Sequence, residues 1–87
     1  NGIHMKEFKV KVEVRLKPVV LDPQGKSVLS ALANLGFEGV HDARVGKLIE
    51  LRIRDGSAES VRIRVDEMCR KLLSNPVIED FVVNIEE

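Results

Sequence analysis

The chain has 87 residues, a length that allows one small domain. Its 14 basic and 14 acidic side chains cancel, which argues against a nucleic-acid partner held by bulk positive charge, and its 44% hydrophobic content excludes a disordered chain. No apolar run approaches the ~20 residues that span a bilayer, so no membrane segment is predicted. The single cysteine, Cys69, excludes an internal disulfide, and we expect a cytoplasmic protein.

The first predicted element is a strand. Residues 1–4 precede Met5 and are interpreted as a cloning scar, which leaves residues 5–87 as a single domain. Apolar residues at 8, 10, 12, 14 and 16 alternate with charged residues from 9 to 17. This alternation predicts one apolar and one charged face, and Pro18 ends the strand because proline lacks the N–H that the ladder needs.

A helix is predicted from Asp22 to Gly36. Asp22 is the expected N-cap, and Pro23 takes the first helical position, where its missing N–H has no helical partner. Apolar residues at 28, 29, 32 and 35 follow at helical spacing. Gly36 is placed for the left-handed conformation that closes a helix.

Two strands are predicted next. The first follows Phe37 and Gly39, runs through about Val45 and turns at Gly46. The second follows the alternation of Ile49, Leu51 and Ile53 with charged residues. A turn at 55–56 and a capping serine at 57 lead into the following element.

The segment after residue 57 allows two interpretations. Val61, Ile63 and Val65 alternate with arginines as in a strand, whereas positions 61, 65, 68, 69, 72 and 73 keep a helical period over a longer window. The length favours a helix that leaves Ile63 on its wetter side and ends at Asn75 and Pro76. Apolar residues at 81, 83 and 85 predict the last strand.

The element order is therefore strand, helix, strand, strand, helix, strand. It predicts an α+β, ferredoxin-like fold, in which a four-stranded antiparallel sheet carries both helices on one face. The opposite face would hold charges of both signs, which is typical of a solvated or polar packing surface; they are Lys9, Lys11, Glu13, Arg15, Glu50 and Arg52. Many unrelated functions share this fold, so it does not identify one.

The residues offer no catalytic constellation. A nucleophile needs a base within reach, but Cys69 lies in an apolar stripe and His41, the only imidazole in residues 5–87, is expected on a strand or loop surface. No paired cysteines and no phosphate-binding glycine loop are present, so we expect neither a metal nor a cofactor on this chain. This combination is typical of a small domain that works by association.

Several segments together resemble the PurS family, the small subunit of phosphoribosylformylglycinamidine synthase. Each motif is weak alone, but their order and spacing match over residues 5–87; they are LDPQGK at 21–26, LGFEGV at 35–40, RVGK at 44–47, MC at 68–69 and KLLSNPVIEDF at 71–81. One departure is the basic pair Arg62 and Arg64, where this family is expected to have a more acidic helix surface.

The resemblance implies a non-catalytic assembly subunit of an ATP-dependent glutamine amidotransferase ligase. That complex converts formylglycinamide ribonucleotide, glutamine and ATP to formylglycinamidine ribonucleotide, glutamate, ADP and phosphate in purine biosynthesis. The family's small subunit bridges the glutaminase subunit and the large synthetase subunit and supports ammonia transfer. ATP and magnesium are expected on the synthetase partner, and self-association to a dimer or tetramer is expected for this chain.

The resemblance also selects partner-interface residues, because turns and helix ends present backbone and charge to partners. They are Asp22, Pro23, Gln24, Gly25, Arg44, Gly46, Lys47, Asn75, Pro76 and Glu79. Lys47 is the clearest candidate, since no turn requires a lysine there.

Two other classes of protein share this element order. A sensor of the ACT type would bind an amino acid at a dimer interface. An RNA-recognition module expects aromatic residues on the exposed face of its central strands, whereas Phe8 belongs to the apolar face of the first predicted strand.

Overall fold

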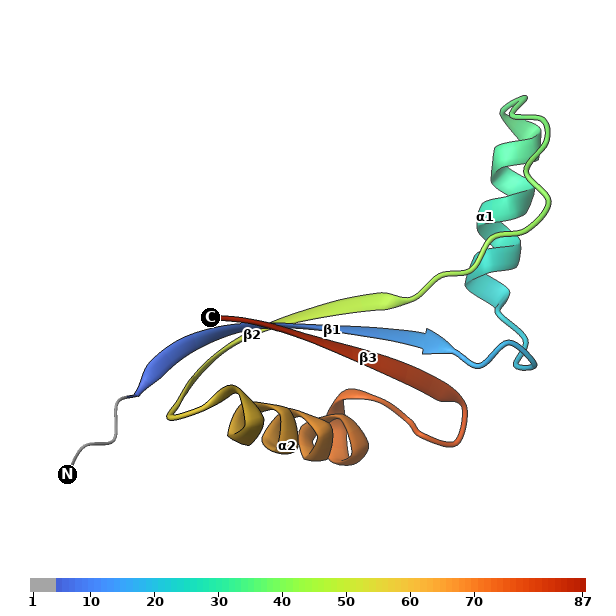
Figure 1. Cartoon of the computed structure of the whole chain (residues 1–87). Coiled ribbons are helices and arrows are strands. Elements are labelled where there is room, and N and C mark those ends of the chain that lie inside the picture. The colour runs from blue at the N-terminus through green and yellow to red at the C-terminus, as the bar shows by residue number, and fades with distance from the viewer. Residues whose placement is uncertain (1–4) are drawn as a thin grey trace.

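A three-stranded antiparallel sheet with one covering helix forms the body of the molecule, and a second helix projects beyond one end of it (Figure 1). The computed structural model describes residues 5–87, so the predicted cloning scar at 1–4 lies outside the described residues. The elements in chain order are β1 (Lys6–Leu16), α1 (Pro23–Asn34), β2 (Lys47–Asp55), α2 (Ala58–Met68), η1 (Cys69–Leu73) and β3 (Glu79–Glu86).

The core lies between α2 and one face of the sheet. β1 is the central strand of the order β2-β1-β3, and its apolar residues Phe8, Val10, Val12 and Val14 are at most 1% exposed. The register keeps apolar residues on the same face, because positions 49, 51 and 53 of β2 and positions 81, 83 and 85 of β3 lie opposite apolar positions of β1. The predicted alternation of β1 and of the last strand is confirmed.

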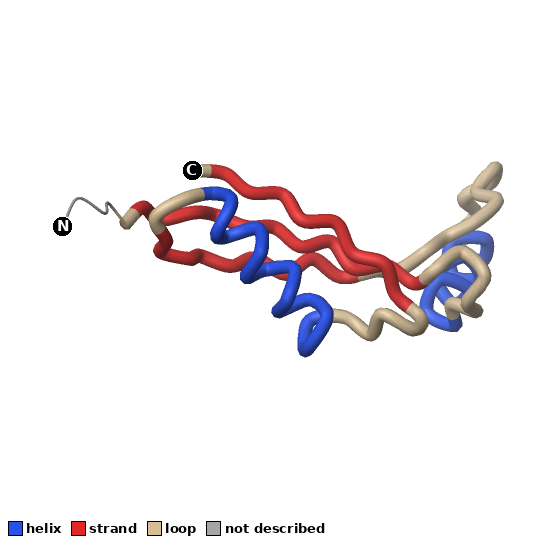
Figure 2. Tube along the Cα trace, turned by 60° about the horizontal axis from the view of Figure 1, so that its bottom comes forward, coloured by secondary structure: helices blue, strands red, loops and turns tan. Residues whose placement is uncertain are grey.

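The ambiguous segment after residue 57 is a helix, as its length predicted. The Ser57 hydroxyl caps α2 by accepting from the Ser60 N–H, and Val61, Val65 and Cys69 are fully buried against the sheet. Ile63 is 64% exposed, as expected for the wetter side. The helix continues as one wider turn, η1, before the chain reverses into β3 (Figure 2).

The caps of α1 are confirmed, but its predicted place on the sheet is wrong. Asp22 is the N-cap, Pro23 is the first helical residue, and Gly36 has a φ of 90°. However, α1 leaves the end of the sheet instead of lying beside α2 (Figures 1 and 2). The radius of gyration is consequently 17.4 Å, against about 12 Å for a compact chain of this length. The helix has an apolar stripe, yet none of the strands within residues 5–87 packs along it.

The prediction of a strand that follows Gly39 and runs through about Val45, with a hairpin turn at Gly46, is also wrong. This segment returns along α1 as an irregular connection, so the described residues form three strands instead of four and lack the ferredoxin-like arrangement. Gly36 and Gly39 both have positive φ, and the Val45 N–H bonds to a carboxylate instead of a neighbouring strand. Gly46 is needed for another reason: a Cβ there would lie 2.6 Å from the Val14 carbonyl oxygen.

Candidate interaction site

The carboxylate of Asp22 joins the start of α1 to the returning connection. Its Oδ1 accepts from the Gly25 N–H at 2.9 Å, and its Oδ2 accepts from the Val45 N–H at 2.8 Å. Asp22 is only 4% exposed although its carboxylate is charged. The N–H donors of Gly25 and Val45 and the nearby Arg44 guanidinium hold the pKa of Asp22 below its usual range, so the group stays ionised at neutral pH.

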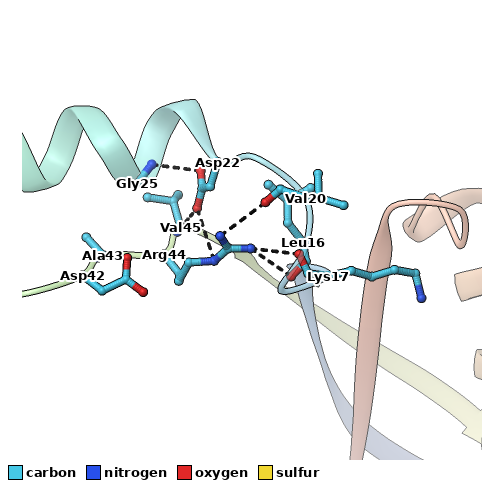
Figure 3. A network of polar contacts seen from close by, with 9 residues as sticks. All are labelled: Leu16, Lys17, Val20, Asp22, Gly25, Asp42, Ala43, Arg44 and Val45. Atoms are coloured by element: carbon cyan, nitrogen blue, oxygen red, sulfur yellow. Dashed lines mark hydrogen bonds and ion pairs between the residues drawn. The ribbon is translucent and has the colours of Figure 1, made fainter.

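Arg44 joins the returning connection to the end of β1. Its guanidinium donates to the carbonyl oxygens of Lys17 at 3.0 Å, Val20 at 3.3 Å and Leu16 at 3.4 Å. Its Nε also lies 4.0 Å from the Asp22 Oδ2 (Figure 3). The planar guanidinium can serve several acceptors at once, so one side chain ties the outgoing connection to the returning one.

Gly25 allows this contact because it has no side chain. A Cβ at this position would lie 2.2 Å from the Ala43 carbonyl oxygen and 2.7 Å from the Asp22 Oδ2. The backbone of the returning connection therefore packs directly on the first turn of α1. We call the group of Asp22, Gly25, Arg44 and Val45 the joint.

The structure brings the motifs LDPQGK and RVGK together, but it gives their residues different roles. The polar groups of Asp22, Gly25 and Arg44 form hydrogen bonds within the chain, at the joint. Pro23 and Gln24 lie on the exposed first turn of α1. Lys47 is the exposed first residue of β2 and follows Gly46 directly.

The last motif, KLLSNPVIEDF, includes the connection between η1 and β3. The Asn75 N–H donates to the Glu79 Oε1 at 2.6 Å, and the Asn75 side-chain oxygen accepts from the Val77 N–H at 3.1 Å. Pro76 is exposed between them. These bonds fold the connection into a local turn, and the Glu79 carboxylate already has a partner inside it.

Lys17 links the last motif, KLLSNPVIEDF, to the joint, a role that the alternation of β1 did not reveal. Its N–H donates to the Ile78 carbonyl at 2.8 Å while its own carbonyl accepts from Arg44. Its ammonium group also lies 2.9 Å from the Asp80 carboxylate. Both candidate loops therefore contact the same end of β1.

Exposed aliphatic residues near this end of β1 were also missed. Val19 and Leu21 are 92% and 64% exposed in one loop, and Val77 is 80% exposed in the other. The signal in the sequence is the apolar run PVVL at 18–21, which lies between a strand end and a helix cap.

The charged face of the sheet matches the prediction. Lys9 lies opposite Arg52 on one side and Glu86 on the other, so this face carries charges of both signs. A hollow of about 380 Å³ on this face is lined by both signs of charge. It favours neither a simple anion nor a simple cation.

The two side chains considered for catalysis, Cys69 and His41, lie in different parts of the fold. Cys69 is buried in the core, where loss of solvent raises the pKa of its thiol, and His41 is exposed on the returning connection. Within residues 5–87, no group of three or more His, Cys, Asp or Glu side chains is arranged to hold a metal ion. None of the helices in this range is long and apolar enough to cross a membrane.

Known proteins match the chain over nearly its whole length. It matches the family PurS, described as phosphoribosylformylglycinamidine (FGAM) synthase, over residues 9–87. It is 49% identical to the phosphoribosylformylglycinamidine synthase subunit PurS of Bacillus subtilis over 80 residues, which is 92% of this chain and 94% of that protein.

Solved structures agree with this match. The purS subunit of Thermotoga maritima superposes with a TM-score of 0.87 at 29% identity and covers 98% of both chains. A chain of PurLQS from the same organism has a TM-score of 0.86 at 30% identity and covers 93% of this chain and 99% of its own length. From its sequence and its fold alike, this chain belongs to the PurS family of phosphoribosylformylglycinamidine synthase subunits.

Proposed function

We propose that this chain is the bridging subunit of a phosphoribosylformylglycinamidine synthase complex. It holds a glutaminase subunit and a large synthetase subunit together, so that ammonia released from glutamine reaches the synthetase without loss to solvent. The synthetase partner binds ATP, magnesium and formylglycinamide ribonucleotide. The chain supplies contacts and no reacting group, and it works in the cytoplasm.

One observation carries this proposal, which is the similarity to a chain of PurLQS from Thermotoga maritima. The two chains correspond over 93% of this one and 99% of the other. A match of this extent to a chain of an assembled complex supports the same place for this chain in a complex of its own. The chemistry of the described residues is consistent with this role, because the one thiol is buried and the one imidazole is exposed away from it.

Self-association is the second part of the proposal. The apolar side of α1 and its continuation are open in the single chain, with Val28, Leu35 and Phe37 exposed by 42%, 73% and 59%. Helices with such a stripe usually bury it against another element. A second copy of the chain supplies a symmetric partner, and an 87-residue chain with a small core gains stability from it.

The predicted interface residues enter the proposal in two groups. Pro23, Gln24 and Lys47 are exposed and can contact a partner directly. Asp22, Gly25 and Arg44 are proposed to shape that surface from within, because their polar groups and close contacts are already used. Gly46, Asn75, Pro76 and Glu79 belong with them as residues that hold the backbone of the two loops.

An assembly experiment tests the bridging role. The chain is mixed with its synthetase and glutaminase partners and with substrates. The mixture is separated by size-exclusion chromatography, and light scattering measures the molar mass of each species that elutes. The proposal expects one species containing all three subunits, which separates into synthetase and glutaminase when this chain is omitted. If the two partners form the same species without this chain, the bridging role is wrong. Arg54→Gln serves as a surface control, since Arg54 is exposed on β2 beyond the candidate loops.

A further inference from the structure

The direction of α1 is set by very few contacts. The chain leaves the sheet after Leu16 and returns to it at Lys47, and α1 lies beyond the end of the strands between these two points (Figure 1). Neither a strand nor α2 packs along the helix, and the molecule is 62 Å long. A helix held this way takes its direction from the two connections at its base, not from a surface beneath it.

The polar contacts across those connections converge on two side chains. Arg44 binds the carbonyl oxygens of Leu16 at the end of β1 and of Lys17 and Val20 in the outgoing connection. Asp22 binds the N–H groups of Gly25 in α1 and Val45 in the returning connection. The two side chains lie 4.0 Å apart, so the sheet end, the helix start and the returning chain meet at one point (Figure 3).

We infer that Asp22 and Arg44 fix the angle at which α1 leaves the sheet, and that they act on assembly as positioning residues rather than as partner contacts. The part that concerns assembly rests on the proposed function. Asp22 is almost fully buried and cannot present its carboxylate to a partner. The Arg44 donors are distributed over three carbonyls of its own chain. Lys47, which is exposed and follows the joint in sequence, is a cation that is free to make direct contact.

The geometry gives the size of the expected effect. The 12 residues of α1 make a rod about 18 Å long. A change of about 20° at its base therefore moves its far end by about 6 Å. A shift of this size would carry the exposed apolar residues of α1 away from the place where a partner contacts them.

Distance measurements on the full chain test the inference. Spin labels are placed at Ser30→Cys in α1 and Glu50→Cys in β2, both at exposed positions, and labelled chain is diluted into unlabelled chain so that only distances within one chain are read. The native Cys69 is buried and does not compete for label; a chain without the two added cysteines checks this. The wild-type background and the control Arg54→Gln should give the same single distance.

Ser30 lies seven residues, about 10 Å, along α1 from Pro23, so the same change of angle moves the label by about 4 Å. Arg44→Gln should therefore shift or broaden that distance by about 4 Å, because an amide cannot reach all three carbonyls. Arg44→Lys should give a distance between those of the wild type and Arg44→Gln, since an ammonium is a compact donor without the planar fork of a guanidinium. Should Arg44→Gln fail to fold by circular dichroism, Asp22→Asn replaces it: the amide keeps one acceptor for the helix cap but loses the acceptor for the Val45 N–H. An unchanged distance in a folded variant would overturn the inference.

The same variants separate this inference from the proposed function. If α1 moves and the three-subunit species is lost in parallel, positioning of assembly is supported. If α1 moves while assembly is unchanged, the positioning role in assembly is wrong. If the wild-type chain does not assemble at all, the proposed function fails, and the distance measurement still decides whether Arg44 sets the angle.

Discussion

Replacing Gly25 by alanine tests the contact on which the joint depends. The new Cβ would lie 2.2 Å from the Ala43 carbonyl oxygen, which is about 1 Å inside ordinary van der Waals contact. The atom it meets belongs to the backbone, so the strain cannot be relieved by turning a side chain. We take the upper end of the usual overpacking cost, about 3 kcal/mol.

Alanine also brings a gain, because it is a better helix former than glycine by about 1 kcal/mol. The net expectation is a loss of about 2 kcal/mol in the free energy of unfolding. For a chain of this size that lowers the melting temperature by roughly 10 °C. Unfolding is best followed by far-ultraviolet circular dichroism, because the chain has neither Trp nor Tyr for fluorescence.

Ser30→Ala is the matched control, since Ser30 is exposed in the same helix. It gains helix propensity without a clash and should leave stability equal or slightly higher. If Gly25→Ala behaves like this control, the close packing of the returning connection on α1 does not exist in solution, and the reasoning about the joint is refuted.

Three further predictions concern an interface side chain, acid stability and the core. Lys47→Ala should melt like the wild type but weaken the three-subunit species in light scattering, because the Lys47 side chain is exposed and its pairing with Val14 uses only the backbone; unchanged assembly would remove it from the interface. Arg64 and Ser60 hold the pKa of Asp55 below its ordinary 3.8, so its stabilising effect is complete above pH 3.8 and is lost as the pH falls. Asp55→Asn should therefore flatten the fall of stability below that pH, and an identical acid limb would show that the contacts with Arg64 and Ser60 are absent. Cys69 should resist alkylation in the folded chain and react in urea, since it is buried and its pKa is raised; rapid reaction under native conditions would contradict the core described above.

Much of the fold follows from local patterns in the sequence. The alternation around Val10 and Val12 defines a strand with one buried face, because side chains in a strand point alternately to its two sides. The caps at Asp22 and Ser57 follow from the free N–H groups of a helix start. Helix α2 could be separated from a strand because its apolar period continues to Cys69, well beyond the length of an alternating run.

The place of α1 could not be predicted for a physical reason. An apolar stripe such as that of Val28 and Leu35 says that a helix buries one side, but not which surface buries it. The ferredoxin-like arrangement assumes a partner within the same chain. Here Val28 and Leu35 stay exposed while Leu29 and Leu32 are half-buried, and the return segment that was predicted as a strand donates the Val45 N–H to Asp22.

The candidate site was half predictable. Motifs marked Asp22, Gly25 and Arg44, but nothing in their types distinguishes a side chain that contacts a partner from one that holds its own backbone. That distinction depends on long-range contacts. Asp22 and Val45 are 23 positions apart in the sequence, and Arg44 and Leu16 are 28 positions apart. Only the folded chain brings these residues together.

The role proposed for this chain is to couple ammonia release to ammonia use, and an activity assay decides whether it does so. Formation of formylglycinamidine ribonucleotide is assayed in the reconstituted system with glutamine and, separately, with free ammonia, each with and without this chain. We expect activity with glutamine to require the chain and activity with ammonia to require only the synthetase. Equal glutamine-dependent rates with and without the chain would show that the chain does not couple the two reactions.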